Sequence, residues 1–244
     1  MGTQTRKQRE IAARHRKILE VAREHLLAGG YLGLSMDRIA AEVQYSKGTI
    51  YQHFPNKEEV VVALAIETAG VRLGVFERAA TFQGKTRERM MAIGVAAEAL
   101  LTRFPNHFLC EQIARAALVE KVSSERQLEL GACENRCMGI CAGIVRDAVA
   151  QGDLIRPEDT RIEEIAFGLW AAAYGVFTIM TGKQISPANL GITNPLETLH
   201  KNQHRLLDGY GWRPLSSEHD YEATRDRIWR EVIEPAFQAL EEDA

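Results

Sequence analysis

The chain has few of the features that mark secreted or membrane-spanning proteins. Its 244 residues include only four cysteines, seven prolines and three tryptophans. The N-terminus is polar and basic and has no apolar segment, so no secretory signal is expected. The most apolar stretch, residues 165–180, contains two glycines and is shorter than the roughly 18 residues of a membrane helix. We therefore expect a cytoplasmic protein without disulfide bonds.

Signatures of catalysis are also missing. The sequence contains no nucleophile-elbow serine with an ordered histidine and acid, no glycine-rich phosphate loop and no His-Glu zinc motif. From residue 58 onward, no alternating strand pattern extends beyond a few residues. These absences predict a non-enzymatic, all-α protein that uses no cofactor and no metal.

Charge is distributed unevenly along the chain, whose formal net charge is −3. Residues 1–57 hold 10 Lys and Arg against 5 Asp and Glu, whereas the remaining 187 residues hold 20 against 28. Such a basic N-terminal quarter indicates a region that faces phosphate. The basic run at 6–17 has two interpretations, a basic arm ahead of the first helix or a solvated charge run.

Residues 35–57 carry the strongest functional pattern. Apolar spacing predicts a first helix from about residue 10 that ends at Gly29–Gly30. The side-chain oxygen of Ser35 is expected to cap a second helix, and that of Ser46 a third helix reaching about residue 54. The third helix then turns outward Lys47, Gly48, Thr49, Tyr51, Gln52 and His53. This pattern is typical of a helix-turn-helix that enters a DNA major groove, or of an ordinary pair of surface helices.

Helical signals continue to the end of the chain. Asn56 is expected to cap the next helix, with Glu59 reaching back in a capping box. Pro235 is expected to kink the last helix. The predicted helices after residue 56 cover about 57–80, 86–103, 105–121, 124–151, 157–181, 195–208 and 219–240.

Together, residues 9–57 resemble the TetR family of transcriptional repressors. The resemblance rests on the first helix running into Gly29–Gly30 and on the runs Ser35–Ala40, Ser46–Phe54 and Asn56–Glu59. It implies an all-α fold with a three-helix DNA-binding domain and basic N-terminal arm over 1–57, and a helical effector-binding and dimerisation domain over 58–244. It further implies a homodimeric repressor that binds double-stranded operator DNA and is released by a small apolar effector.

The resemblance also assigns DNA contacts by position. Lys47 and Gln52 are expected on base edges, because Lys suits guanine acceptors and Gln suits adenine. Gly48 would let the helix backbone approach the DNA. Phosphate contacts are expected from the helix start at Ser35 and Arg38, and from Thr49, Tyr51, His53 and Lys57. Two alternatives stay open, a packing role for the Tyr51 ring and a helix cap for His53.

One position departs from the family pattern. Gln44 and Tyr45 stand where the family usually has glycine and a small aliphatic residue. If the turn needs a positive φ, Gln44 adopts it at a cost of about 1 kcal/mol. Tyr45 then has to fit a site made for a smaller side chain, or turn its hydroxyl toward a phosphate.

The larger domain offers candidates for a ligand site and an interface. Phe108, Trp170 and Tyr174 are the expected effector contacts, although methionine and aromatic side chains at helical spacing more often form a plain core. The resemblance places the dimer interface on the last two long helices, with intramolecular core as the alternative. These helices carry two apolar stripes, Ile165, Leu169, Ala172, Val176 and Ile179, and Ile228, Val232 and Ala236.

Three cysteines form a stripe of their own. Cys133, Cys137 and Cys141 lie four residues apart and therefore share one face of a helix. Buried cysteine is a common small hydrophobic residue, whereas three thiolates could react with oxidants or bind a soft metal. A metal- or thiol-responsive transcriptional sensor is thus the alternative function.

Overall fold

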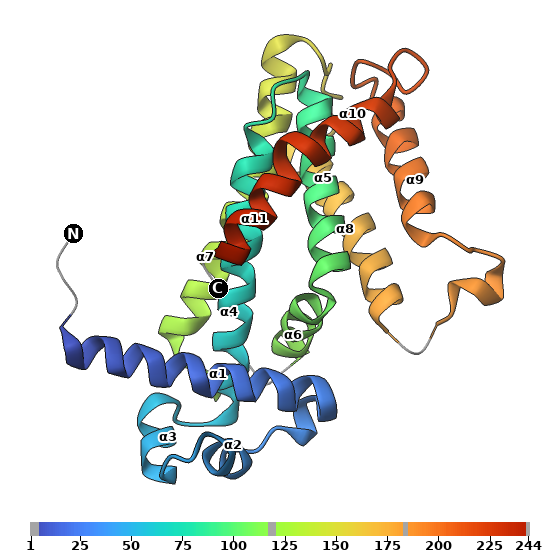
Figure 1. The fold of residues 1–244 in the computed structure, drawn as a ribbon. Coiled ribbons are helices and arrows are strands. Elements are labelled where there is room, and N and C mark those ends of the chain that lie inside the picture. Colours follow the sequence, from blue (N-terminus) through green and yellow to red (C-terminus); the bar gives the residue numbers. More distant parts are fainter. Residues whose placement is uncertain (1–4, 117–120, 183–184, 243–244) are drawn as a thin grey trace. The chain divides into compact units, whose positions relative to one another are not determined.

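The computed structural model describes residues 5–116, 121–182 and 185–242, and the regular structure in these ranges is helical. The all-α class expected from the sequence is confirmed (Figure 1). Two compact units make up the chain, Met1–Gly70 with Asn106–Cys133 and Val71–Pro105 with Glu134–Ala244. Each unit has its own hydrophobic core.

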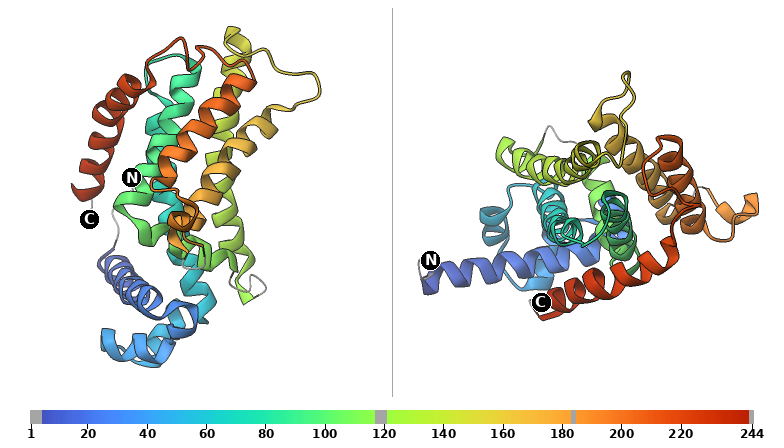
Figure 2. Two further views of the ribbon diagram at one scale, coloured as in Figure 1. Left: turned by 90° about the vertical axis from the view of Figure 1, so that its right-hand side faces the viewer. Right: turned by 90° about the horizontal axis from the view of Figure 1, so that it is seen from above.

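The first unit contains α1, which lies across α2 and α3 in both sets of views (Figures 1 and 2). Its core is built from these three helices, the start of α4, and Cys110 and Ala114 of α6. The compact unit therefore extends past residue 57, and a functional division at that residue stays a prediction. The elements that contribute to this unit are α1 (Arg6–Gly33), α2 (Met36–Val43), α3 (Lys47–His53), α4 (Lys57–Ala80), α6 (Pro105–Ala116) and α7 (Ser124–Gln151).

The two ends of α1 refine the sequence prediction. Thr5 caps the helix, because its Oγ1 accepts from the Gln8 N–H at 3.3 Å and the Gln8 Oε1 accepts from the Thr5 N–H at 2.8 Å. The basic side chains from Arg6 onward therefore belong to the helix itself. The predicted stop at Gly29–Gly30 is present as a break: Gly30 has φ 61°, which glycine adopts at little cost, and one further turn leads to Gly33.

The second unit contains the remaining parts of α4 and α7 together with all later elements. In this unit α9 packs beside α8, and α10 beside α5. The predicted bounds of the helices at 86–103 and 124–151 are confirmed, whereas α8 begins five residues after the predicted 157. Its further elements are α5 (Thr86–Arg103), α8 (Ile162–Thr181), the 3₁₀ helix Pro187–Leu190, α9 (Pro195–Gly209), α10 (Tyr221–Ile228), the π-helical turn Trp229–Ile233 and α11 (Glu234–Glu242).

The last predicted helix differs from expectation in shape and in use. It consists of α10, the π-helical turn and α11, so the irregularity precedes Pro235, which has no N–H to donate. Its apolar stripe Ile228, Val232 and Ala236 is buried in the core of the same unit. The prediction that this stripe forms the dimer interface is therefore wrong, because intramolecular packing already covers it.

Helix α8 leaves much of its apolar surface uncovered. Its 20 residues are long and apolar enough to cross a membrane by composition, and 22% of the window is buried. The helix is longer than the apolar stretch 165–180, but one such helix is weak evidence of a membrane span, because a core helix passes the same test. One side of α8 packs into the core through Ile165 and Leu169, whereas Phe167 is 56% exposed and Trp170 is 37% exposed. A half-buried helix with an open apolar face indicates a surface that binds another molecule.

Candidate nucleic-acid interface and ligand cavity

Capping interactions fix where the helices of the candidate DNA-binding motif begin. The Ser46 Oγ accepts from the Thr49 N–H at 3.1 Å, and the Asn56 Oδ1 accepts from the Glu59 N–H at 2.8 Å, so both predicted caps are confirmed. Ser35 occupies the N-cap of α2, but its hydroxyl makes no capping hydrogen bond to any described residue. Its carbonyl takes part instead and accepts from the Ile39 N–H at 3.0 Å. The predicted side-chain cap at Ser35 is therefore wrong.

The turn between α2 and α3 is left-handed at Gln44, with φ 58° and ψ 37°. This agrees with the prediction of a positive φ at a non-glycine residue. The N–H groups of Gln44 and Tyr45 donate to the carbonyls of Ala41 and Ala40 at 3.3 and 3.1 Å. The half-buried Tyr45 packs against the core of the first unit, and Lys17 Nζ lies 5.7 Å from its ring centroid. The larger side chain is thus accommodated by packing.

Replacing Gln44 by glycine is expected to stabilise the protein by about 0.5–1 kcal/mol, because glycine adopts this left-handed conformation without the Cβ clash. Urea unfolding followed by circular dichroism measures the change. The matched control is Gln52→Gly inside α3, which should lower stability by about 1 kcal/mol. A destabilised Gln44→Gly variant would contradict the expectation.

The outward face of α3 is polar and accessible. Ser46, Lys47, Gly48 and Gln52 are exposed and Tyr51 is 48% exposed, whereas Thr49 and His53 are half-buried. The Lys47 Nζ lies 2.7 Å from the Asp37 Oδ2, whose hydrogen bond and charge raise the pKa of Lys47. A Cβ added at Gly48 would meet only the Ser46 Oγ, at 3.8 Å, so the backbone there is open to a close partner.

The two remaining basic candidates have partners of their own. The exposed Arg38 donates from Nη1 to the Gly33 carbonyl at 3.3 Å. The half-buried Lys57 holds its Nζ 4.0 Å from the ring centroid of Tyr31, and donates to the Tyr31 carbonyl at 3.5 Å. A phosphate group at Lys57 would therefore compete with this contact.

Two histidines pack where α1 meets the end of α3. The ring of His15 lies 4.6 Å from that of Phe54 and 5.8 Å from that of His53, measured between centroids. Burial lowers the pKa of both histidines from the ordinary 6.5, and nearby charge adds to this, from Arg126 at His15 and from Arg14 at His53. His53 thus has packing contacts, whereas the helix cap considered for it stays a prediction.

These lowered pKa values predict a loss of stability in mild acid. Unfolded histidine has the higher pKa, so below about pH 6.5 the unfolded state binds more protons than the folded state. The stabilisation is full above that pH and is lost as the pH falls through the lowered folded values. Urea unfolding between about pH 7 and pH 5 gives the free energy of unfolding as a function of pH. This free energy should fall less steeply with decreasing pH in His15→Phe than in the parent protein, because the phenylalanine keeps a ring but cannot be protonated. Equal slopes in the two proteins would contradict the role assigned to His15.

Buried carboxylates tie the start of α4 to the segment before α7. Glu59 does not reach back to its own helix cap as predicted; its Oε1 accepts from the Ser123 N–H at 2.6 Å and its Oε2 lies 2.7 Å from the Arg126 Nε. The capping box is therefore wrong, because a distant segment uses the carboxylate. The Asn56 amide also donates to the Lys121 carbonyl at 3.0 Å, and the Arg126 guanidinium lies 5.3 Å from the ring centroid of Phe54.

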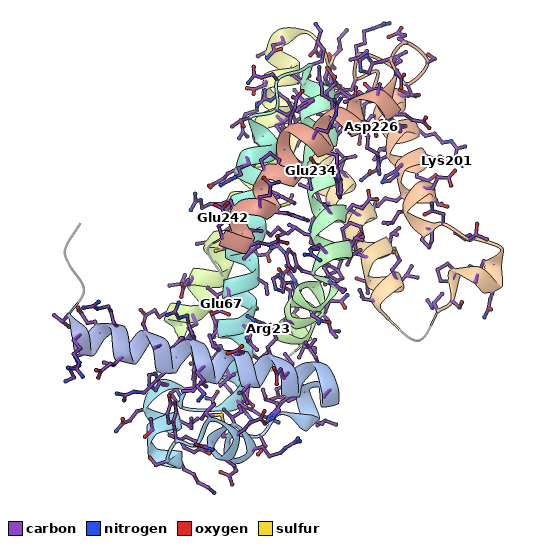
Figure 3. All side chains as sticks on the ribbon, in the orientation of Figure 1. Arg23, Glu67, Lys201, Asp226, Glu234 and Glu242 are labelled. Atoms are coloured by element: carbon purple, nitrogen blue, oxygen red, sulfur yellow. The ribbon has the colours of Figure 1, made fainter. Side chains whose placement is uncertain are left out.

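Further ion pairs join α1 to α4 in the same unit. The Tyr31 hydroxyl donates to the Glu58 Oε1 at 2.6 Å. The Arg23 Nη2 lies 2.8 Å from the Glu67 Oε2, and Figure 3 shows these two labelled side chains near one another. Helix α3 is thus held by a unit that includes the start of α4 and the start of α7.

A cavity of about 110 Å³ lies within the second unit. Most of its wall is apolar and comes from α4, α5, α7 and α8, whereas one end is polar and comes from α9 and α10. Among the predicted effector contacts, Trp170 lines the cavity, and Tyr174 stacks on Trp170 with 5.2 Å between ring centroids. Phe108 belongs to the first unit and is not among the described residues that line the cavity.

Sequence reasoning missed the polar end of the cavity, which consists of His200, Gln203, His204 and Arg225. The Arg225 Nη2 lies 3.2 Å from the Glu98 Oε2, and the His200 Nε2 lies 2.7 Å from the same oxygen. Close by, the buried Arg87 donates to the Asp208 Oδ1 at 2.6 Å and to the Trp212 carbonyl at 2.7 Å. These pairs join α5 to α9 and α10, and no local motif marks them in the sequence.

Two of the three cysteines in the predicted stripe occupy core positions, whereas Cys133 is half-buried. Cys137 and Cys141 are buried in the second unit, and burial, with the neighbouring Cys137, raises the pKa of Cys141 to about 12. Thiolate, the reactive and metal-binding form, is scarce at such a pKa. Among the described residues, no group of three His, Cys, Asp or Glu side chains could hold a metal ion. The metal- or thiol-sensor interpretation thus finds no support.

Comparison with known proteins places this arrangement in a family. The family model of bacterial regulatory proteins, tetR family, matches residues 18–64, which span the helix-turn-helix and its flanking helices. Residues 18–64 thus carry the DNA-binding region of the TetR family. A relative over this region, the HTH-type transcriptional repressor AcnR of Corynebacterium diphtheriae, is 40% identical over 60 residues. That match covers 25% of the present chain and only 32% of AcnR.

Solved structures share the fold over most of the chain. A TetR/AcrR regulator from Thermobifida fusca is 25% identical with a TM-score of 0.61, and the match covers 81% of this chain and 98% of that one. The regulator FadR from Bacillus subtilis, solved in complex with stearoyl-CoA, is 17% identical with a TM-score of 0.60, covering 80% of this chain and 98% of FadR. The second similarity concerns the fold alone.

Proposed function

We propose that this chain is a homodimeric transcriptional repressor of the TetR family that binds operator DNA through α3 and leaves it when a small, largely apolar effector enters the cavity. The observation that carries the proposal is the exposed polar face of α3, on a helix fixed by the Ser46 cap and by the buried Phe54. A rigid element with accessible basic and hydrogen-bonding side chains is what major-groove recognition needs.

The proposed DNA contacts fall into two groups. Lys47 and Gln52 are exposed and reach base edges, and Gly48 permits close approach of the backbone. In the DNA complex, Lys47 exchanges its Asp37 partner for base acceptors. Phosphate contacts that fix the register come from Ser35, Arg38, Ser46, Thr49, Tyr51, His53 and Lys57.

The DNA assignment is tested with an operator selected in vitro from random duplexes. Lys47→Ala and Tyr51→Ala should each weaken binding about tenfold or more, since a good base or phosphate contact contributes about 1–3 kcal/mol. Lys201→Ala is the matched control, because this labelled side chain is exposed on α9 of the second unit (Figure 3). Wild-type affinity in both α3 variants would contradict the assignment.

A second copy of the chain is the proposed partner of the open face of α8. Phe167 and Trp170 are exposed there, and α9 beside it exposes Leu206. Two such helices from each subunit would form a four-helix interface, and a dimer suits two operator half-sites. Sedimentation should show a wild-type dimer and a monomeric Phe167→Glu variant. A wild-type monomer at micromolar concentration would contradict this proposal.

The proposed release mechanism couples the cavity to α4. This helix begins in the first unit and continues into the second, so a ligand that favours one position of α4 changes the placement of α3. Dimers reading half-sites one DNA turn apart need a separation of about 34–36 Å, and a small tilt reduces the fit. FadR, which shares the fold, was solved in complex with stearoyl-CoA, and this supports the proposal that the present chain binds a ligand.

A further inference from the structure

We infer that the cavity selects an uncharged molecule whose apolar body ends in a hydrogen-bonding group, and that Gln203 binds this group. The inference rests on the proposed function, because it names the chemical class of the effector for the same cavity. It is carried by three observations: the apolar wall, the pairing of the charged groups at the polar end, and the free amide of Gln203.

The wall defines the body of the ligand. Met90, Leu169 and Trp170 are among the apolar side chains that line a cavity of about 110 Å³. An engineered apolar cavity of about 150 Å³ holds benzene. The present cavity is smaller, so the apolar body it holds is limited to about one ring, and the remaining ligand atoms extend toward the polar end.

The charged groups at the polar end already neutralise one another. Arg225 donates from Nη1 and Nη2 to the two oxygens of Glu98, at 3.4 and 3.2 Å. His200 shares the Glu98 Oε2 at 2.7 Å. A ligand carboxylate would have to displace Glu98 from Arg225, and a ligand ammonium would have to displace Arg225 from Glu98. Either exchange leaves one partly buried charge without its partner, which disfavours a charged ligand.

Gln203 is the polar residue that remains available. It lines the cavity, it is half-buried, and its amide has no hydrogen-bond partner within the part of the chain that the structure describes. An amide offers two donors and one acceptor oxygen, so it suits a partner that both donates and accepts. A half-buried, unpaired amide at the end of an apolar cavity favours a ligand that satisfies it over one that does not.

The surroundings of Gln203 leave room for such a partner. A Cβ added at Gly94 of α5 would lie 4.0 Å from the Gln203 Oε1, so the missing side chain keeps volume free beside the amide. Glycine inside a helix is normally unfavourable, which is consistent with a role for this space. The His204 Nδ1 lies 3.4 Å from the Arg87 Nη2, a donor, so the His204 Nε2 carries the proton and offers a second donor.

The test measures binding to the full-length protein without DNA. Isothermal titration compares four probes of similar shape: phenylacetamide, phenylacetate, phenethylammonium and ethylbenzene. We expect phenylacetamide to bind about tenfold tighter than the other three, because only this probe satisfies both the donors and the acceptor of the Gln203 amide. Gln203→Leu should remove this preference and Gly94→Ala should reduce it. Gln151→Leu, at the exposed end of α7, is the matched control and should keep it.

Several results would overturn the inference: tightest binding by phenylacetate or phenethylammonium, a phenylacetamide preference that survives in Gln203→Leu, or no binding by any probe. Thermal unfolding of Gln203→Leu shows whether that variant is folded, and Gly94→Ala provides an independent variant if it is not.

A chain that prefers phenylacetamide but binds no DNA contradicts the proposed repressor function and leaves the inference standing. A chain that binds DNA but prefers phenylacetate contradicts the inference alone.

Discussion

We expect the Asp208→Asn variant to unfold with a free energy about 3 kcal/mol lower than that of the parent protein, because it removes the charge opposite a buried guanidinium. Arg87 is 1% exposed, and Asp208 is its carboxylate partner at 2.6 Å. The Arg87 Nε is already buried without a hydrogen bond to the described residues, so the loss of Asp208 would add a second unsatisfied group to the same guanidinium. Two backbone carbonyls remain as acceptors, which places the loss at the lower end of the range for broken buried pairs.

Urea unfolding measures this loss, and the matched control is Asp226→Asn. Asp226 is exposed on α10, labelled in Figure 3, and its side chain makes no hydrogen bond among the described residues. The control should change stability by less than about 0.5 kcal/mol. The double variant Arg87→Met with Asp208→Asn should cost less than the sum of the single variants, because no charge is left unpaired. Additive losses would contradict this account.

The second large effect is expected at Glu59. Glu59→Ala should lower the stability of the protein by about 3 kcal/mol, because Arg126 and the Ser123 N–H lose their shared acceptor. It should also weaken the proposed DNA binding, since the Arg126 guanidinium lies over the ring of Phe54, the residue that ends α3. The Glu59 carboxylate itself is buried, so it is not expected to contact DNA directly.

Fluorescence anisotropy on the selected operator measures the second part of this prediction at a temperature where both proteins are folded. Glu129→Ala is the matched control, because Glu129 is exposed on α7 and has no ion pair within the described ranges. It should leave stability and affinity unchanged. Loss of stability without loss of DNA affinity would show that the segment at 121–126 does not position α3.

Local signals account for what the sequence predicted well. Helix α7 ends at Gln151 because Gly152 follows with φ 76°, and Ser46 caps α3 from within its own turn. Gln44 was predicted correctly because its left-handed conformation is demanded by the short connection between two helices. The α8 start was placed too early because Pro157 resembles a helix start, whereas the residues that follow it form a turn.

Long-range partners explain the errors. Glu59 looked like a capping-box residue, but a backbone N–H 64 positions later competes for the same carboxylate. The polar end of the cavity was missed because Glu98 meets His200 and Arg225 across 102 and 127 positions. The stripe on the last helix suited core and interface equally, since spacing alone does not say which surface covers it.

The π-helical turn at Trp229–Ile233 has a consequence for how the C-terminal segment varies in length. A π turn holds about one residue more than an α turn, and a helix advances about 100° per residue. With the extra residue, Val232 and Ile233 are both buried and Ala236 still reaches the core. Deleting Arg230 would rotate everything that follows by about 100° and turn Ala236 away from it. Homologues that lack the turn should therefore align with a one-residue gap here, accompanied by changed residue types throughout α11.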